Sequence, residues 1–252
     1  MKKTLILATI ILAIAAQQLA AQSDKTITVT SLEWPPYTGQ SLKDLGASSV
    51  VAVAAFKAMG YDLKIEFFPW DRAVYLAKTD PKYAGYFPEY WSDDNAKTFI
   101  YSDAMGTGPL GFVERKDAPV KWAALDDLKG ITIGVVDGYI NTPQFDAMVA
   151  SKLFKADAAP DDATNVVKVA QKRFPIAVID PNVLNYLLVF DTKTIQYKDA
   201  LQFNAQILGL KKLYMCFKRG ADGEKYAQIL NNGLKKINVD KVMKDYFIAL
   251  GL

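Results

Sequence analysis

Histidine is absent from all 252 residues of the chain, and Cys216 is the single cysteine. Without histidine the chain lacks the commonest general base, the nucleophile–histidine pairs of many hydrolases and the usual zinc ligand. A single cysteine excludes an internal disulfide, and its apolar surroundings, Leu213–Phe217, predict a buried and inert thiol. We therefore expect a protein that is not an enzyme and that has no catalytic residues, no metal and no cofactor.

Basic runs are absent as well, and the formal charge of +3 includes Lys2 and Lys3 near the N-terminus. The remainder of the chain is close to neutral, so neither nucleic-acid binding nor attachment to a membrane surface is expected. Beyond the N-terminal segment, no apolar stretch is long enough to span a bilayer.

Residues 1–21 have the three parts of a secretory signal peptide. Lys2-Lys3 is followed by an apolar run from Leu5 to Ala16 and then by small residues around Ala20-Ala21. The apolar run is too short to anchor the chain in a bilayer, and no cysteine follows it that could carry a lipid. We expect a mature protein that is exported to the periplasm, soluble and monomeric.

The stretch Tyr83–Trp91 is unusual because it contains five aromatic residues and one carboxylate. Its aromatic residues predict a strand over residues 83–87, ended by Pro88, which cannot donate to a sheet ladder. Glu89 and Tyr90 would then follow the carboxyl end of the strand, where open α/β sheets bind ligands. A carboxylate between aromatic rings favours a cationic ligand. A surface turn that covers the sheet edge is the alternative interpretation.

Strands and helices alternate along the chain, which predicts an α/β fold with largely parallel sheets. Two further strands are expected over residues 26–30 and 63–68, and each ends at a proline that precedes or follows a tryptophan. Their ends should bring aromatic side chains to the same side of the sheet as Glu89. These side chains are Trp34, Tyr37 and Trp70.

The second half of the chain places two polar side chains next to expected strands. Asn141 follows the strand over residues 131–136 and precedes a helix that Thr142-Pro143 should begin. Asp180 ends the buried strand that begins at Ile176. Asn141 either offers its amide to an anion or belongs to an ordinary turn. Asp180 either contacts a ligand or merely caps the next helix.

The order of these pieces resembles the polar amino-acid-binding family of periplasmic solute receptors, the family 3 extracellular solute-binding proteins of ABC importers. The resemblance extends from about Thr26 to the C-terminus. It is carried by Glu33-Trp-Pro-Pro-Tyr37, Pro69-Trp70, Tyr101-Ser-Asp103, Leu125-Asp-Asp-Leu-Lys-Gly130 with Ile133-Gly-Val-Val-Asp-Gly138, and Arg173 seven residues before Asp180.

The resemblance implies a two-lobed periplasmic-binding-protein fold of type II, with mostly parallel sheets and two crossover strands. Ligand would bind in the cleft between the lobes. The crossovers would lie near Leu110–Arg115 and Leu213–Lys218. Lobe one would then cover residues 22–112 plus 216–252, and lobe two residues 113–215.

The resemblance also implies roles for single residues. Asp180 matches the carboxylate that takes the ligand's ammonium, and Trp34 and Trp70 match the rings on either side of the ligand. The arginine that binds the ligand's α-carboxylate is replaced by Asn95, so an ordinary α-amino acid fits the pattern less well than an amine. The expected ligand-binding residues are Trp34, Tyr37, Trp70, Glu89, Tyr90, Asn141 and Asp180.

These residues predict an exported receptor that binds a small amine-bearing or cationic, amino-acid-like solute and delivers it to the membrane subunits of an ABC importer. The first alternative is an accessory or sensor protein of the periplasm on the same fold, with a partly filled cleft. The second is an enzyme, since some lytic transglycosylases carry a related module. Those enzymes have an added catalytic domain, for which this chain has no room.

Overall fold

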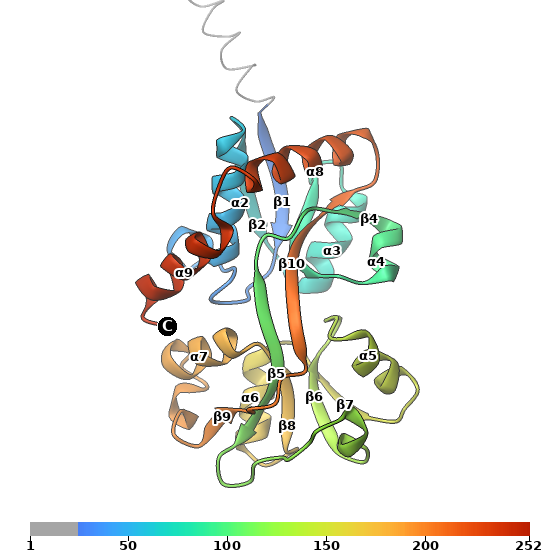
Figure 1. Ribbon diagram of the computed structural model, residues 1–252, viewed down its shortest axis with the longest axis vertical. Helices are drawn as coiled ribbons and strands as arrows, with labels where there is room; N and C mark the ends of the chain where they lie inside the picture. The colour runs from blue at the N-terminus through green and yellow to red at the C-terminus, as the bar shows by residue number, and fades with distance from the viewer. Residues whose placement is uncertain (1–24) are drawn as a thin grey trace, which may run out of the picture.

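The computed structural model describes residues 25–252, which form two α/β lobes joined by two long strands (Figure 1). The signal peptide predicted over residues 1–21 lies outside the described residues. The joining strands are β5 (Thr107–Arg115) and β10 (Gly209–Lys218), which pair with each other antiparallel between the lobes. In residues 25–252 no helix combines the length and the apolar character that crossing a membrane requires.

Lobe one is built around a parallel group of strands in which β1 lies between β2 and β3. Buried apolar side chains from these strands pack against helices on both sides, for example Val29 of β1 against Val51 and Phe56 of the first long helix. The elements are β1 (Thr26–Ser31), η1 (Lys43–Leu45), α2 (Ala47–Ala58), β2 (Asp62–Phe67), α3 (Trp70–Thr79), β3 (Gly85–Tyr90), α4 (Asp93–Thr98), β4 (Phe99–Tyr101), α8 (Ala221–Leu234) and α9 (Val239–Leu250).

Lobe two repeats this plan, with β6 lying parallel between β7 and β8. Its core is formed by Ile133, Phe145, Val166 and Leu184, which come from one strand and three helices. The elements are η2 (Leu125–Leu128), β6 (Thr132–Val136), α5 (Pro143–Ala150), β7 (Lys155–Ala159), α6 (Asp162–Ala170), β8 (Ile176–Ile179), α7 (Pro181–Phe190), η3 (Ile195–Tyr197) and β9 (Leu201–Phe203).

The three helices of lobe two each begin with a side-chain cap. Thr142 Oγ1 accepts from the backbone N–H of Phe145 at 3.3 Å, and Asp161 Oδ1 accepts from Thr164 at 2.7 Å. Asp180 caps α7 in the same way. Because a cap satisfies N–H groups that a helix leaves unpaired, these residues fix where each helix starts. The predicted start of α5 at Thr142-Pro143 is confirmed.

The predicted fold class is confirmed, with one refinement in strand direction. The strands at the centre of each lobe are parallel, but β10 is antiparallel to β3 and β5, and β5 is antiparallel to β8. The result is a mixed, curled sheet in the order β2-β1-β3-β10-β5-β8-β6-β7. We propose to keep the predicted lobe boundaries, because both of them lie within the crossover strands β5 and β10.

The predicted end of the third strand at Pro88 is wrong. Strand β3 continues to Tyr90, and Glu89 and Tyr90 pair with Tyr214 and Leu213 of β10. The register between β3 and β10 shifts beside Pro88, which is a β-bulge. A bulge is one of the places where a strand tolerates proline, since a ladder hydrogen bond is already missing there. Glu89 and Tyr90 are therefore strand residues and do not follow the strand.

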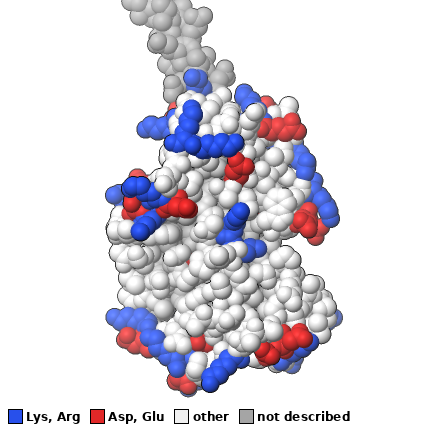
Figure 2. Space-filling view, viewed as in Figure 1, with Lys and Arg blue, Asp and Glu red and all other residues white. Residues whose placement is uncertain are grey.

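Charged side chains are distributed unevenly over the face shown in Figure 2. Basic and acidic groups lie near one another along the outer rims of both lobes, and few charges lie in the band where the lobes meet. Ligand contacts at this junction are therefore to be sought among buried groups.

Close packing of α8 on α2 generates a first prediction. A Cβ on Gly233 of α8 would collide with the backbone carbonyl oxygen of Ala55 in α2. Gly233→Ala should lower the free energy of unfolding by about 1–3 kcal/mol, the usual cost of overpacking. In an open helix the same change would stabilise the protein. The measurement is urea denaturation.

The matched control for this experiment is Gly209→Ala. A Cβ at Gly209 would meet only Thr142 Cγ2 at 3.5 Å, which is ordinary contact. Its free energy of unfolding should change by no more than about 0.5 kcal/mol. Equal effects of the two substitutions would contradict the packing argument.

Candidate functional site

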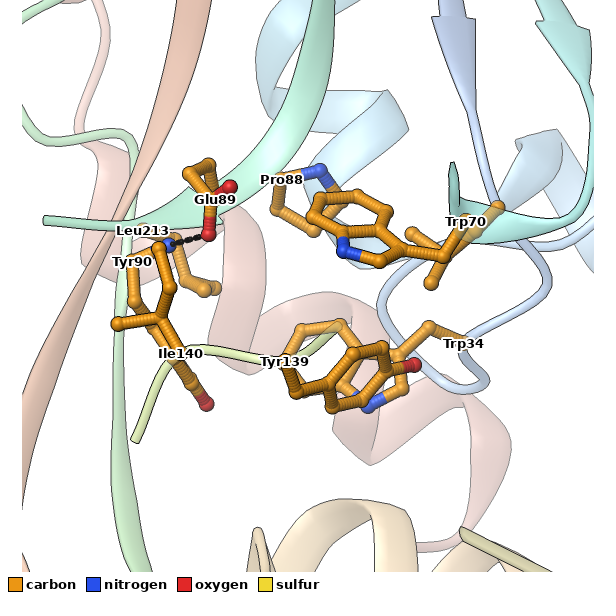
Figure 3. A pocket seen from close by; sticks show the side chains of 9 residues that line it. Trp34, Trp70, Pro88, Glu89, Tyr90, Tyr139, Ile140 and Leu213 are labelled. Carbon is orange, nitrogen blue, oxygen red and sulfur yellow. Dashed lines mark hydrogen bonds between the residues drawn. The ribbon is translucent and has the colours of Figure 1, made fainter. Parts of the chain in front are cut away.

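The two lobes meet around a small cavity of about 30 Å³ (Figure 3). This volume has room for roughly one or two water molecules. Lobe one contributes Trp34 and Trp70 to its walls, and lobe two contributes Tyr139. Of the predicted ligand-binding residues, Glu89 and Tyr90 also line this cavity. The structure thus brings together the residues that were expected at the ends of three strands.

Aromatic rings fill most of the space between the lobes. Trp34 stacks on Tyr37 with 4.5 Å between ring centroids and meets the edge of Tyr90 at 6.1 Å. Trp70 packs edge-on against Tyr139 of lobe two at 5.9 Å. Tyr37 is fully buried behind Trp34 and lines none of the cavities at the junction. It therefore supports the wall of the cleft rather than forming its surface.

Direct hydrogen bonds also join the lobes. Trp70 Nε1 donates to the carbonyl oxygen of Gly138 at 3.1 Å, and the Tyr37 hydroxyl donates to Asp180 Oδ2 at 3.0 Å. Gly138 has a φ of +72°, and a Cβ there would lie 2.7 Å from Asp71 Oδ1. Only glycine combines this backbone conformation with so close an approach of the two lobes. The cleft is closed by the protein's own side chains.

Asp180 follows the end of β8, where it caps the next helix and also faces the lobe junction. Its Oδ1 caps α7 by accepting from the backbone N–H of Asn182 at 2.7 Å and of Val183 at 3.3 Å. Its Oδ2 faces Tyr37 across the lobe junction. Burial raises the pKa of Asp180 to about 7, although these hydrogen bonds favour the charged form. The carboxylate is 2% exposed.

Glu89 is held within its own lobe by three donors. Tyr86 donates its hydroxyl to Oε2 at 3.0 Å, Asn95 donates its amide to Oε2 at 2.9 Å, and the backbone N–H of Tyr90 donates to Oε1 at 2.8 Å. Burial raises the pKa of Glu89 to about 7. Asn95, at the position expected for a carboxylate-binding arginine, thus binds a carboxylate of the protein itself.

Asn141 lies at the junction, but its polar groups are also used internally. Its backbone N–H and its side-chain amide each donate to the carboxylate of Asp146 at 2.9 Å. Its carbonyl oxygen accepts from the ammonium of Lys211. The N–H and the amide of Asn141 are therefore paired with Asp146, and the N–H of Phe145 in α5 is paired with Thr142. The observed hydrogen bonds give the anion-binding role no support.

Two charged residues at the junction were missed by the sequence analysis. Lys211 of β10 is buried beneath Tyr90, with its Nζ 4.9 Å from the centroid of that ring. Burial lowers the pKa of Lys211, and the nearby carboxylates of Asp146 and Glu89 oppose that shift. Lys211-Lys212 lies just before the expected strand Leu213–Lys218, and β10 begins earlier, at Gly209. An expected strand that included the pair would have turned one of the two lysines inward, since neighbouring strand residues face opposite sides.

Asp162 is the second missed residue, at the first turn of α6. It lines two cavities at the junction and is 8% exposed. Burial, together with the charges of Asp180 and Asp161, raises the pKa of Asp162 to about 7. The sequence analysis gave Asp162 no role, because the helix that it begins opens on polar residues.

No protein-family model and no curated protein sequence matches the chain. Solved structures do match it. A histidine kinase sensor domain with similarity to periplasmic binding proteins is 17% identical, and the match covers 88% of this chain and 94% of that domain with a TM-score of 0.74. The periplasmic VFT2 domain of BvgS from Bordetella pertussis is 18% identical over 92% and 97% of the two chains, with a TM-score of 0.73.

A third match is the amino acid ABC transporter substrate-binding protein AbpA from Streptococcus pneumoniae, bound to L-arginine. It is 14% identical over 91% of this chain and 98% of its own, with a TM-score of 0.71. The chain has the periplasmic-binding-protein fold. Identities of this size establish the fold alone. In this periplasmic-binding-protein fold the closed junction between the lobes is the candidate ligand site.

The buried carboxylates of this periplasmic-binding-protein fold generate a prediction for stability. In the folded protein the pKa values of three carboxyl groups are about 7, namely those of Asp162, Asp180 and Glu89. In the unfolded chain a carboxyl group has a pKa of about 4. Between these pH values the folded protein therefore binds more protons than the unfolded chain does. The free energy of unfolding should therefore fall as the pH rises from about 5 to about 8. The chain has no histidine that would titrate in this window.

Urea denaturation across that pH range measures the slope. Asp180→Asn should make it shallower by at least about 1 kcal/mol over the window, since asparagine caps a helix as well as aspartate does but carries no charge. Asp126→Asn, at an exposed position paired with Lys129, is the matched control and should leave the slope unchanged. A free energy of unfolding that rises toward pH 8 would contradict the assignment.

Proposed function

We propose that the protein is an exported receptor that binds a small amine-bearing or cationic, amino-acid-like solute between its lobes and delivers it to an ABC importer. The observation that carries this proposal is the buried Asp180, which faces the lobe junction without a cationic side chain as partner. In the described part of the chain, none of the ion pairs includes Asp180. A buried carboxylate without a countercharge is costly, and a cationic ligand would remove that cost.

The aromatic walls support the same class of ligand. Trp34, Trp70 and Tyr139 present ring surfaces at the cavity, and such surfaces attract cations that have left water. The matched structures include proteins named for amino-acid binding, among them a T. maritima ArgBP in its arginine-bound form. From this comparison we infer that the ligand has an amine. We do not infer an α-carboxylate, because the groups that could bind it, the Asn95 amide and the Lys211 ammonium, already donate to Glu89 and to the carbonyl oxygen of Asn141.

An accessory or sensor role in the periplasm is the second candidate. It is favoured by one observation, namely that side chains close the cleft through Trp70–Gly138 and Tyr37–Asp180 bonds. Two of the matched structures are sensor domains, one of a histidine kinase and one of BvgS. A sensor would use the closed arrangement itself as its signal, with or without a solute.

One matched protein is an ancestral amino acid-binding protein described as a precursor of cyclohexadienyl dehydratase. No catalytic step is proposed here.

Calorimetric titration tests the receptor proposal. Amines, polyamines, amino acids and dicarboxylates are titrated into the wild-type protein and into Asp180→Asn and Trp34→Ala. Asp180→Asn should weaken binding of a cationic solute by about 2–5 kcal/mol, because it removes the charge of a buried partner. Trp34→Ala should cost less, about 1–3 kcal/mol, through lost stacking and burial.

Two controls accompany this titration. Trp91→Ala removes a tryptophan that is 46% exposed and lines none of the cavities at the junction, and Asp126→Asn removes an exposed carboxylate. Neither should change the affinity. Tight binding of an anionic solute, with Asp180→Asn harmless, would show that the ligand class is wrong.

Small-angle scattering separates the receptor from the sensor. The cavity of about 30 Å³ is too small for a whole solute unless the lobes part, and two connecting strands favour such a hinge motion. A receptor should sample open arrangements in its free state and become more compact with saturating ligand. An unchanged radius of gyration at saturation would favour the accessory or sensor role.

A further inference from the structure

A second small cavity, of about 20 Å³, lies on the lobe-two side of Tyr90. It has room for a single group about the size of a water molecule. Tyr90, Asp162 and Asp180 line it from β3, α6 and the end of β8. The phenol of Tyr90 points from lobe one toward lobe two, alongside Ile140 (Figure 3).

The Tyr90 hydroxyl is unusual because it has no hydrogen-bond partner among the described residues. Tyr90 is 8% exposed, so water does not freely satisfy this hydroxyl. Buried polar groups in folded proteins nearly always have a partner, and an exception often marks a site whose ligand is missing. The hydroxyl therefore indicates that a polar group belongs in this cavity.

Three hydrogen-bond acceptors converge on the cavity. Each carboxylate oxygen has two lone pairs, so Asp180 Oδ2 keeps one beyond the bond from Tyr37. The charged form of Asp162 is favoured by the indole of Trp34 and by its own backbone N–H, which leaves acceptor capacity on its carboxylate. The Tyr90 oxygen is the third acceptor. In the described residues none of the ion pairs includes Asp162 or Asp180.

A primary ammonium matches this arrangement. Its –NH₃⁺ group has three N–H donors and a positive charge, and its size is close to that of water. Each donor would find one acceptor, and the single positive charge would offset part of the negative charge of two carboxylates that lack a cation. A methylated amine has fewer donors and a larger volume, so it fits neither the acceptors nor the space.

A wide groove of about 730 Å³ leads outward from this cavity. The groove and the cavity share Trp34, Tyr139 and Asp162 as lining residues, so Asp162 lies at the passage between them. Its walls carry apolar surface from Phe68, Val183 and Leu187. The charged residues of the groove are four carboxylates and one lysine, namely Glu33, Asp161, Asp162, Asp191 and Lys193.

We propose that the cleft takes a linear polyamine, whose terminal primary ammonium occupies the cavity between Asp162, Asp180 and Tyr90 while its remaining amines and methylene groups lie in the acidic groove. This inference rests on the proposed receptor function and names its ligand class. Asp162 is the specificity-determining residue: it contributes the second carboxylate of the cavity and the innermost carboxylate of the groove.

The presence of both carboxylates and apolar side chains in the groove favours a polyamine over a short monoamine. Methylene spacers would lie against the apolar walls, and each further ammonium would meet one of the groove carboxylates. A groove with a net excess of acidic groups also attracts a polycation over a distance. An amino acid would place a carboxylate among these four acidic side chains, with Lys193 as the single basic residue of the groove.

The test is calorimetric titration of spermidine, hexylamine and N,N,N-trimethylhexylammonium into the purified protein. Spermidine should bind more tightly than hexylamine because of the groove. The trimethylated probe should bind at least roughly tenfold more weakly than hexylamine, since its head leaves buried acceptors unpaired. Asp162→Asn should weaken spermidine binding by roughly 30-fold or more, and Tyr90→Phe by roughly tenfold.

The thermal stability of the two variants without ligand distinguishes a binding role from a structural one. Loss of a structural side chain would lower the midpoint of thermal unfolding. Asp162→Asn removes a buried charge that has no countercharge, and Tyr90→Phe removes a buried hydroxyl that has no hydrogen-bond partner. Both should therefore raise the midpoint of thermal unfolding while they weaken binding. Asp126→Asn is the control and should change neither quantity. If Asp162→Asn does not fold, Tyr90→Phe alone should still show both effects, namely a higher midpoint of thermal unfolding and weaker spermidine binding.

The outcomes separate this inference from the function on which it rests. Unchanged spermidine binding by both variants, together with a loss for Asp180→Asn, would overturn the polyamine cavity and leave the amine receptor standing. Equal affinity for the trimethylated and primary probes would overturn it in the same way. Failure of every amine to bind the wild-type protein would overturn both.

Discussion

A single buried hydrogen bond, from the Tyr37 hydroxyl to Asp180, organises the junction of this molecule. Asp180 ends a strand of lobe two and caps the helix that follows it, so its position is fixed from one side. Tyr37 is fixed within lobe one by stacking on Trp34 and by contact with Phe247 in the C-terminal helix. Its hydroxyl also accepts from Asn182 of lobe two. The contact thus connects a loop of lobe one, the last helix of the chain and the cap of α7.

The chemistry of the junction follows from how its charges are distributed. The cationic and amide groups that could receive an anion are already bonded to the protein, Lys211 to Asn141 and Asn95 to Glu89. Two carboxylates, Asp162 and Asp180, are in none of the ion pairs of residues 25–252, and burial raises their pKa values to about 7. A site with this imbalance selects for positive charge before any question of shape arises.

Much of the fold and part of the site could be predicted from local signals. Prolines next to Trp34 and Trp70 fix the ends of two strands, and the strand that ends on Asp180 is continuous and apolar, so their positions follow from sequence. The end of β3 did not follow, because the bulge that accommodates Pro88 belongs to its pairing with β10, far along the chain. Asp162 was missed because β7, just before it, lacks an apolar pattern and the helix begins on polar residues.

The bond from Trp70 to the main-chain carbonyl of Gly138 has a kinetic consequence. A solute cannot enter while this bond and the ring contacts beside it hold the lobes together, so every productive encounter waits for a spontaneous separation. At low solute concentration the association rate depends on collisions, but at high concentration it reaches a ceiling equal to the opening rate. The affinity is reduced by the small fraction of open molecules. The release of a bound molecule then depends on breaking the same Trp70–Gly138 bond and ring contacts that delayed its entry.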